Sequence, residues 1–467
     1  MPVLLISTYE LGHQPFGLAS PAAWLRRAGV DVRVIDAAKE PVTDEAIRGA
    51  DLIAFHLPMH TATRLAGPLI GKAHALNPAA RLCAYGLYAP LNADWLRSLG
   101  VSDVLGGEFE EELTAIAIGG AAPSPAATAT QAQHGEAQRP SIPRLHFLTP
   151  DRSTLPPLAR YASLNLGDGT TRVVGYTEAS RGCRHLCRHC PVVPIYEGQF
   201  RVVQPEVVFA DVTAQVAAGA QHITFGDPDF FNGPAHALRI VEGVHAAHPS
   251  LTYDVTIKVE HLLQHRDLLP RLRATGCLFV TSAVESVDDH VLALLEKGHT
   301  RQDFVDAVSA CREAGVMLAP TFVAFHPWLT LDGYCDLLDT IADLDLVDHV
   351  APIQLAIRLL IPRGSRLMEL EDVQGLVGPF DPATLAYRWT SPDPRVDHLH
   401  RAINTRIGVR LTWDRREAFA EISALAHAAA GTEPPARPRA SAHAPVPFLS
   451  EPWYCCAEPN PDQLRLV

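Results

Sequence analysis

Short apolar runs alternate with helical patterns over residues 1–118. The runs predict buried strands, and the segments between them, such as Ala19–Ala28 and Thr63–Leu76, have the apolar spacing of amphipathic helices. Strands that alternate with helices form a parallel sheet covered on both faces, so five such units predict a doubly wound, flavodoxin-like α/β domain. The predicted strands are Val3–Ser7, Val30–Ile35, Leu52–His56, Leu82–Tyr85 and Asp103–Leu105.

A second series of alternating strands and helices covers residues 142–365. Its six units predict a partial (β/α)6 barrel, in which the chemistry lies at the carboxyl ends of the strands. The predicted strands are Val173–Thr177, His222–Phe225, Thr252–Ile257, Leu278–Ala283, Leu318–Ala324 and Ile353–Leu359, and the helices include Val207–Ala218, His236–His248, His290–Leu295 and Arg301–Ala314.

Two stretches of small, polar and proline residues interrupt these patterns. Residues 119–141 predict a flexible linker, because they cannot bury enough apolar surface to become ordered. Residues 366–430 predict a small helical region, clearest in Val396–Ile407 and Arg415–Ala430. Residues 431–467 predict a second linker followed by a short tail.

Composition narrows the classes of protein that fit. The net charge of −13 (39 basic against 52 acidic residues) argues against nucleic-acid binding, which needs a basic surface. No run of about 18 apolar residues predicts a membrane span, and the N-terminus lacks the pattern of a signal peptide. Nine cysteines are too sparse for a disulfide scaffold. We therefore expect a cytoplasmic protein, with Cys83, Cys277, Cys311 and Cys335 in the core.

Three of the cysteines lie close together in the segment EASRGCRHLCRHCP. Cys183, Cys187 and Cys190 have the spacing C-x3-C-x2-C and follow the first predicted strand of the barrel. Soft thiolates select iron–sulfur clusters, zinc or copper, and three thiolates leave one iron of a four-iron cluster open. The alternative is a zinc site in which His185 or His189 supplies the fourth ligand.

This motif, in the first loop of a six-unit barrel, resembles the signature of the radical S-adenosylmethionine (SAM) superfamily over about residues 142–365. The resemblance implies a [4Fe-4S] cluster on Cys183, Cys187 and Cys190, whose open iron chelates SAM. It implies reductive cleavage of SAM to a 5′-deoxyadenosyl radical, which abstracts hydrogen from a small-molecule or peptide substrate. A reducing donor such as flavodoxin or ferredoxin would supply the electron.

The resemblance also implies contacts with SAM elsewhere in the barrel. His189 stands where family members often carry an aromatic residue near adenine. Gly226, Asp227 and Asp229 are similar to the loop that holds the SAM amino group, although a plain strand-end turn has the same residue types. Glu285 is implied to contact the ribose or methionine part of SAM, and a surface or capping carboxylate is the alternative.

The last two predicted strands of the barrel carry further candidates. Thr321–Phe325 is implied to pack near the adenine of SAM. Arg358 is notable because polar groups are costly inside a sheet unless they are paired. It could bind a substrate or cofactor carboxylate, and a structural ion pair is the alternative.

The N-terminal region resembles the cobalamin-binding domain that precedes many radical SAM barrels. The residues that carry this resemblance are Pro15–Leu18 and Gly106–Glu110. Asp-x-His-x-x-Gly is absent, so the sequence supplies no cobalt-ligating histidine of that type, and a degenerate covering domain is the alternative. Three histidines, His13, His56 and His60, stand at predicted strand ends.

The tail contains Trp-Tyr-Cys455-Cys456-Ala-Glu-Pro. It resembles the radical SAM proteins named for a Cys-Cys-Ala-Glu-Pro or Cys-selenocysteine-Ala-Glu-Pro tail. This resemblance implies a catalytic role for Cys455 and Cys456 as metal ligands, as a transient disulfide or as hydrogen-atom donors; an incidental exposed pair is the alternative. For the whole chain, the sequence favours a radical SAM enzyme with possible cobalamin-dependent methyl transfer over a non-enzymatic iron–sulfur or zinc protein.

Overall fold

A computed structural model describes residues 1–119, 142–408, 414–434 and 444–451. The N-terminal domain is a five-stranded parallel sheet with the order β2-β1-β3-β4-β5. This is the flavodoxin-like order, so the predicted class of this domain is confirmed. Its strands are β1 (Val3–Ser7), β2 (Val32–Asp36), β3 (Leu52–His56), β4 (Arg81–Tyr85) and β5 (Asp103–Leu105).

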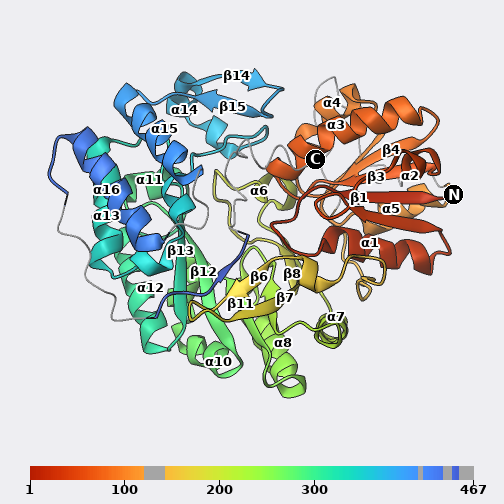
Figure 1. The fold of residues 1–467 in the computed structure, drawn as a ribbon, viewed down its shortest axis with the longest axis horizontal. Helices are drawn as coiled ribbons and strands as arrows, with labels where there is room; N and C mark the ends of the chain where they lie inside the picture. Colours follow the sequence, from red (N-terminus) through yellow and green to blue (C-terminus); the bar gives the residue numbers. More distant parts are fainter. Residues whose placement is uncertain (120–141, 409–413, 435–443, 452–467) are drawn as a thin grey trace.

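Helices cover both faces of this sheet, as its apolar strands require (Figure 1). Helices α1 and α5 pack on one face, through residues such as Leu18 and Leu113, and α2, α3 and α4 pack on the other. These helices are α1 (Phe16–Arg27), α2 (Asp44–Arg48), α3 (His60–Leu76), α4 (Ala93–Ser98) and α5 (Glu110–Ala117), with the 3-10 turn η1 (Pro90–Asn92) before α4.

The second sheet is a curled half-barrel with the order β13-β12-β11-β10-β7-β6-β16. Five of its strands are parallel: β7 (Thr171–Thr177), β10 (His222–Phe225), β11 (Thr252–Thr256), β12 (Cys277–Glu285) and β13 (Met317–Phe322). Two short antiparallel strands, β6 (Ser163–Asn165) and β16 (Phe448–Leu449), extend one edge. Residues of the predicted second linker therefore form a strand of the barrel sheet.

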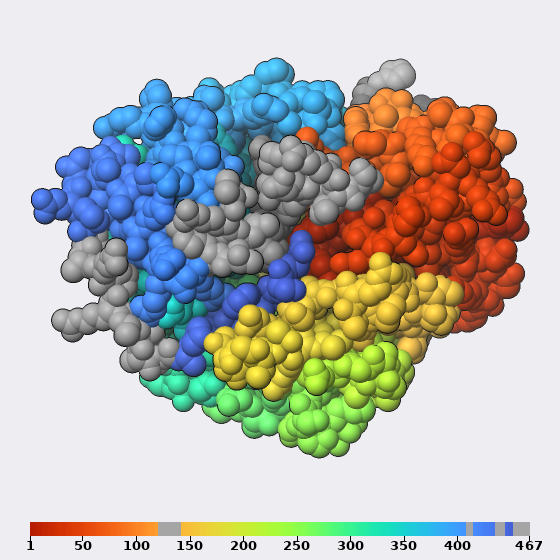
Figure 2. Space-filling model, viewed as in Figure 1, coloured from red at the N-terminus to blue at the C-terminus, as the bar shows by residue number. Residues whose placement is uncertain are grey.

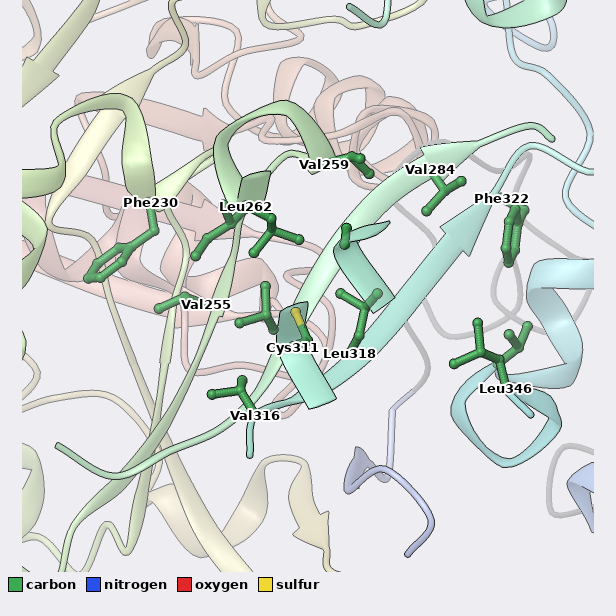
Figure 3. Packing of buried hydrophobic residues seen from close by; sticks show 14 of the residues in the cluster. Phe230, Val255, Val259, Leu262, Val284, Cys311, Val316, Leu318, Phe322 and Leu346 are labelled. Atoms are coloured by element: carbon green, nitrogen blue, oxygen red, sulfur yellow. The ribbon is translucent and has the colours of Figure 1, made fainter. Parts of the chain in front are cut away.

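Helices pack on the convex face of the half-barrel and bury the largest core of the protein. Figure 3 shows part of this core, in which Val255, Val284 and Leu318 from the strands meet Leu262 and Cys311 from the helices. The four cysteines that we expected in the core are buried. The helices are α7 (Pro205–Ala217), α8 (Pro234–Ala247), α9 (Val259–Gln264), α10 (Leu269–Ala274), α11 (Asp289–Leu294), α12 (Arg301–Glu313) and α13 (Leu331–Asp343).

The sixth predicted strand, Ile353–Leu359, is not a strand. Its first part is a 3-10 turn, η6 (Pro352–Leu355), and its second part forms one isolated parallel bridge between Phe325 and Arg358. The Gln354 side chain accepts a hydrogen bond from the backbone N–H of Phe322 at 3.2 Å, where a neighbouring strand would otherwise pair. The barrel thus contains five parallel strands and a bridge.

The C-terminal region contains the expected helices and a hairpin that the sequence did not predict. Helices α15 (Pro394–Gly408) and α16 (Arg415–Ala430) pack beside the barrel (Figure 1). The hairpin consists of β14 (Val377–Asp381) and β15 (Ala386–Trp389). It reaches the N-terminal domain, where His60 Nε2 lies 2.7 Å from the carbonyl oxygen of Thr384. The remaining elements are α6 (Val193–Tyr196), α14 (Glu371–Leu376), β8 (Ser180–Gly182), β9 (Phe200–Val202), η2 (Leu158–Arg160), η3 (Phe230–Asn232), η4 (Arg266–Leu268), η5 (Val347–His349) and η7 (Arg366–Glu369).

A short C-terminal segment crosses the boundary between the two domains. Figure 2 shows residues 444–451 in dark blue, lying along the yellow start of the barrel and reaching the red N-terminal domain. Val446 is buried against Leu164 of β6, and the Tyr9 hydroxyl donates to Glu451 Oε1 at 2.8 Å. Among the described residues, no helix is long and apolar enough to cross a bilayer.

Candidate cluster and cofactor site

The cysteine loop begins at a sharp turn that only glycine can form. Gly182 ends β8 with φ at +78°, and a Cβ there would lie 2.4 Å from Tyr196 and 2.6 Å from the carbonyl oxygen of Gln199. The turn directs the chain out of β8 into the loop that carries Cys183 and connects β8 to β9. Backbone geometry therefore fixes the position of the first cysteine.

None of the three loop cysteines is in a disulfide bond within the described residues, and Cys187 is buried while Cys183 and Cys190 are half-buried. The backbone N–H of Cys190 donates to the carbonyl oxygen of Cys187 at 3.2 Å, which winds the loop into a tight turn. Burial raises the pKa of Cys183 to about 11. A set of three soft donors in one loop fits an iron–sulfur cluster.

A second donor set shares Cys183. Ligand atoms of Cys183, His185 and Asp229 all lie within 4.8 Å of one another, a set that would suit a single zinc ion. This set leaves out Cys187 and Cys190. Metal analysis distinguishes a zinc ion on this set from a cluster on the three cysteines.

Two predicted SAM contacts, His189 and Glu285, meet beside the cysteine loop. His189 Nε2 lies 3.1 Å from Glu285 Oε1, and Lys297 Nζ lies 3.4 Å from the same oxygen. Burial alone would raise the pKa of Glu285, but Lys297 and His189 outweigh it and hold the pKa at about 2. Burial alone would lower the pKa of Lys297, but Glu285, Cys187 and Cys190 raise it. Glu285 is therefore ionised and Lys297 is an ammonium at neutral pH.

Asp227 holds the strand-end loop that precedes the cysteines. Its carboxylate accepts hydrogen bonds from the backbone N–H of Ala179 at 2.9 Å and from the Ser180 hydroxyl at 2.5 Å. Burial raises its pKa to about 7 despite these hydrogen bonds. Gly226 is required next to it, because a Cβ at Gly226 would lie 1.8 Å from the Tyr176 hydroxyl.

Asp229 faces two histidines and the cysteine loop. Its Oδ2 lies 2.7 Å from His261 Nδ1 and 3.5 Å from His185 Nε2, while Oδ1 accepts from the backbone N–H of Phe231. Burial alone would raise the pKa of Asp229, but the two histidines outweigh it and lower the pKa. The structure thus brings Asp229 close to Cys183.

A cavity of about 360 Å³ lies between the loops that follow β12 and β13. Its lining includes Glu285, Ala324, His326 and Trp328. His326 Nδ1 and Trp328 Nε1 are buried and have no hydrogen-bond partner in the part of the chain that the structure describes. Because an unpaired buried polar group is costly, these atoms favour a ligand that offers polar partners.

Arg358 does not lie free to bind a ligand. One guanidinium nitrogen pairs with Asp397 Oδ1 at 2.7 Å and another donates to the carbonyl oxygen of Trp389 at 2.7 Å, while the guanidinium carbon lies 3.6 Å from the centre of the Trp389 ring. This geometry favours the structural ion pair over the cofactor contact. Cys455 and Cys456 lie outside the described residues.

Arg181 joins the cysteine loop to the N-terminal domain. It lies in β8, two residues before Cys183, and its guanidinium reaches Glu108 at 2.9 Å, Glu110 at 2.7 Å and Glu178 at 2.7 Å. Glu108 and Glu110 follow β5, at the carboxyl edge of the N-terminal sheet. The carboxyl edge of one sheet is therefore held against the cysteine loop of the other.

The carboxyl edge of the N-terminal sheet contains buried polar atoms that have no hydrogen-bond partner among the described residues. They include Ser7 Oγ at the end of β1 and His56 Nδ1 at the end of β3, and His56 Nδ1 lies 3.4 Å from Glu10 Oε2. A Cβ at Gly17 would lie 2.0 Å from the His56 ring, so the glycine in the Phe-Gly-Leu segment makes room for it. His13 is also buried, and burial lowers its pKa to about 4.

Two important residues were not among the predicted site residues. Arg181 and Lys297 are both almost fully buried, at 8% and 3% exposed. The sequence does contain a signal for each, because Arg181 lies two residues before Cys183 and Lys297 lies twelve residues after Glu285, in the segment KGHT. Their partners come from distant segments, which the sequence alone does not reveal.

Comparison with known proteins agrees with this geometry. Residues 177–340 match the profile of the radical SAM superfamily, so this part of the chain belongs to that superfamily. The matched residues lie in the barrel, which follows the flavodoxin-like domain.

Two solved structures share the fold over 92% of the chain. One is the cobalamin-dependent SAM radical enzyme OxsB with aqua-cobalamin and SAM bound, with a TM-score of 0.69 and 14% identity over 71% of that chain. The other is the radical SAM methyltransferase TsrM from Kitasatospora setae with cobalamin and a [4Fe-4S] cluster bound, with a TM-score of 0.62 and 17% identity over 88% of that chain. The likeness extends across both domains.

Curated relatives match a smaller part of the chain. A tRNA-2-methylthio-N(6)-dimethylallyladenosine synthase of Desulfosudis oleivorans is 26% identical over 192 residues, which are 38% of this chain and 39% of the relative. A putative methylthiotransferase of Methanocaldococcus jannaschii is 25% identical over 184 residues, which are 37% of this chain and 40% of the relative. The chain thus matches about two fifths of the length of these relatives.

Proposed function

We propose that the chain holds a [4Fe-4S] cluster on Cys183, Cys187 and Cys190, binds SAM at the open iron, and binds cobalamin at the carboxyl edge of the N-terminal sheet. The proposed reaction is methyl transfer to an unactivated carbon or phosphorus atom of a small molecule or peptide. The observation that carries this proposal is the Arg181 network, because it holds the cysteine loop against that edge. The two solved structures with the same fold support it, since both contain cobalamin.

The residues present fit these groups. The unpartnered Ser7 Oγ and the pair of Glu10 and His56 are polar groups that could hold a polar ligand such as cobalamin. His326 and Trp328 could bind the acceptor atoms of adenine in the cavity beside Glu285. When bound, the cluster supplies the electron that cleaves SAM, and cobalamin supplies a carrier for the methyl group.

We also propose that Cys455 and Cys456 act at the junction between the domains. The described chain ends at Glu451, which is anchored by Tyr9 and lies against Gly12 of the N-terminal domain. Cys455 follows Glu451 by four residues in the sequence. A tethered thiol has a high effective concentration at a nearby site.

Anaerobic reconstitution tests the cluster and the reaction class. We expect about four irons per chain in the wild type, near-complete loss of iron in the triple variant C183A/C187A/C190A, and retained iron in the control C311A, whose thiol is in the core. With SAM and a chemical reductant, we expect 5′-deoxyadenosine or S-adenosylhomocysteine by mass spectrometry. A single bound zinc and no SAM cleavage would overturn the proposal in favour of the non-enzymatic zinc protein.

Two further measurements test the cobalamin and the substrate class. Absorbance spectroscopy after incubation with cobalamin should show a bound corrinoid that the variants S7A and E10Q weaken. The tRNA-modifying relatives offer the second candidate substrate, since their sequences match part of the barrel. Retention of tRNA at physiological salt would support that candidate, whereas the net charge of −13 leads us to expect none.

A further inference from the structure

Residues 294–297 form a support beneath the cysteine loop. The backbone N–H of Arg188 donates to the carbonyl oxygen of Leu295 at 3.0 Å, and its guanidinium donates to that of Leu294 at 2.8 Å. The same guanidinium pairs with Glu296 at 2.7 Å. The next side chain along the support is Lys297, so its position relative to the loop is fixed by the backbone.

Lys297 is a buried ammonium with one carboxylate, Glu285, beside it. It is 3% exposed, and its hydrogen bond to Glu285 Oε1, at 3.4 Å, is long for a buried ion pair. That oxygen is shared with His189. An ammonium has three N–H donors, and burying one is costly unless further negative charge lies nearby. Cys187 and Cys190 are the next negative groups that act on it.

Two arginines near the loop, Arg181 and Arg188, differ in this respect. Arg181 has three carboxylates around it, and Arg188 pairs with Glu296 at 2.7 Å while its side chain is 20% exposed. Their charges are therefore balanced within the protein or screened by water. Among these three, Lys297 is the basic group with most positive charge left for the cysteine sulfurs.

We infer that Lys297 balances the thiolates of Cys187 and Cys190 and makes the cluster easier to reduce. The inference rests on the proposed cluster. Reduction adds negative charge to a cluster that three thiolates already make negative, and a buried positive charge stabilises the reduced form more than the oxidised form. Net charge and local interactions are among the factors that set the reduction potentials of such clusters. Lys297 thus acts through the cysteines and does not need to contact the substrate.

A redox titration of reconstituted protein without SAM tests this role, with the reduced cluster followed by electron paramagnetic resonance. At the wild-type midpoint, K297M and K297Q should each show at least a tenfold lower ratio of reduced to oxidised cluster, which corresponds to a midpoint about 59 mV more negative. K297R should stay near the wild type because it keeps the charge. E285Q should shift in the opposite direction because it removes a neighbouring negative charge.

The matched control is K72M, which removes a lysine that pairs with Asp44 in the N-terminal domain. Equal midpoints in the wild type and K297M, or equal shifts in K297R and K297M, would overturn the inference. If both neutral variants fail to take up iron while K297R loads fully, charge balance is supported. Equal iron loss in all three indicates a packing role instead. If the wild type assembles no cluster, the proposed function itself is wrong. This outcome is distinct from failure of the Lys297 inference alone.

Discussion

Replacing Arg181 with methionine should destabilise the protein strongly, because it removes the shared partner of three buried or half-buried carboxylates. Glu108 and Glu110 have fully buried side chains, and that of Glu178 is 19% exposed. Removing one partner of a buried ion pair costs about 3–5 kcal/mol, since the remaining charge is left without compensation. With about 2.1 cal/mol/K of unfolding entropy per residue, the chain has about 1 kcal/mol/K, so Tm should fall by about 3–5 °C.

The pH dependence gives this prediction a signature that a packing defect lacks. Without the guanidinium, burial raises the folded-state pKa of these carboxyls above the unfolded values. The folded variant then binds more protons than the unfolded chain, so its stability falls as pH rises. The difference in Tm between R181M and the wild type should therefore be small at pH 5.5 and large at pH 8.

Thermal unfolding of the apoprotein, followed by circular dichroism at several pH values, measures both effects. The control is R271M, which breaks the half-exposed pair of Arg271 and Glu242, where a loss below about 1 kcal/mol is expected. R181K should fall between the wild type and R181M, because an ammonium cannot form the same fork of hydrogen bonds. A Tm loss in R181M no larger than that of R271M, or one independent of pH, would refute the reasoning.

Three further predictions concern stability. Burial raises the pKa of Asp227 from 3.8 to about 7, so the stability of the apoprotein should fall between about pH 4 and pH 7 through this group and level off above pH 7. In thermal unfolding at several pH values, D227N should reduce this dependence of Tm on pH. G226A should lose about 1–3 kcal/mol because its Cβ would collide with Tyr176, while G71A, with open space around it in α3, should be neutral or slightly stabilising by the same assay. V446A should lower the free energy of unfolding by about 1–2 kcal/mol, since Val446 is 2% exposed; a loss of only a few tenths would show that the segment 444–451 is not packed on the barrel.

Local sequence patterns were enough to predict most of the fold. The strand Val3–Ser7 and its neighbours are buried on both faces, so their apolar runs are unambiguous, and their order follows from alternating strands and helices. The three loop cysteines could be proposed as cluster ligands because their spacing is local to one loop. His189, Asp229 and Glu285 could be placed near that loop because strand ends meet at one edge of a parallel sheet.

Other features depended on contacts between distant segments. The apolar run Ile353–Leu359 predicts a strand or a buried turn equally well, and Pro352 at its start favours the turn. The role of Arg358 is decided by Asp397, which lies 39 residues away in α15. The hairpin β14–β15 is short and half-exposed, so it has little of the apolar alternation that reveals a strand.

The construction of the domain junction has a consequence for the proposed chemistry. A purely apolar interface would allow the domains to slide slightly against each other. The Arg181 guanidinium, by contrast, keeps its hydrogen bonds to Glu108, Glu110 and Glu178 only while the two domains hold one relative position. Because Arg181 is two residues from Cys183, a change in the orientation of the N-terminal domain is transmitted directly to the first cysteine. The network therefore makes the geometry of the cluster site dependent on the domain proposed to hold cobalamin, and the paramagnetic signal of the cluster should differ between R181K and the wild type even where both bind the same amount of iron.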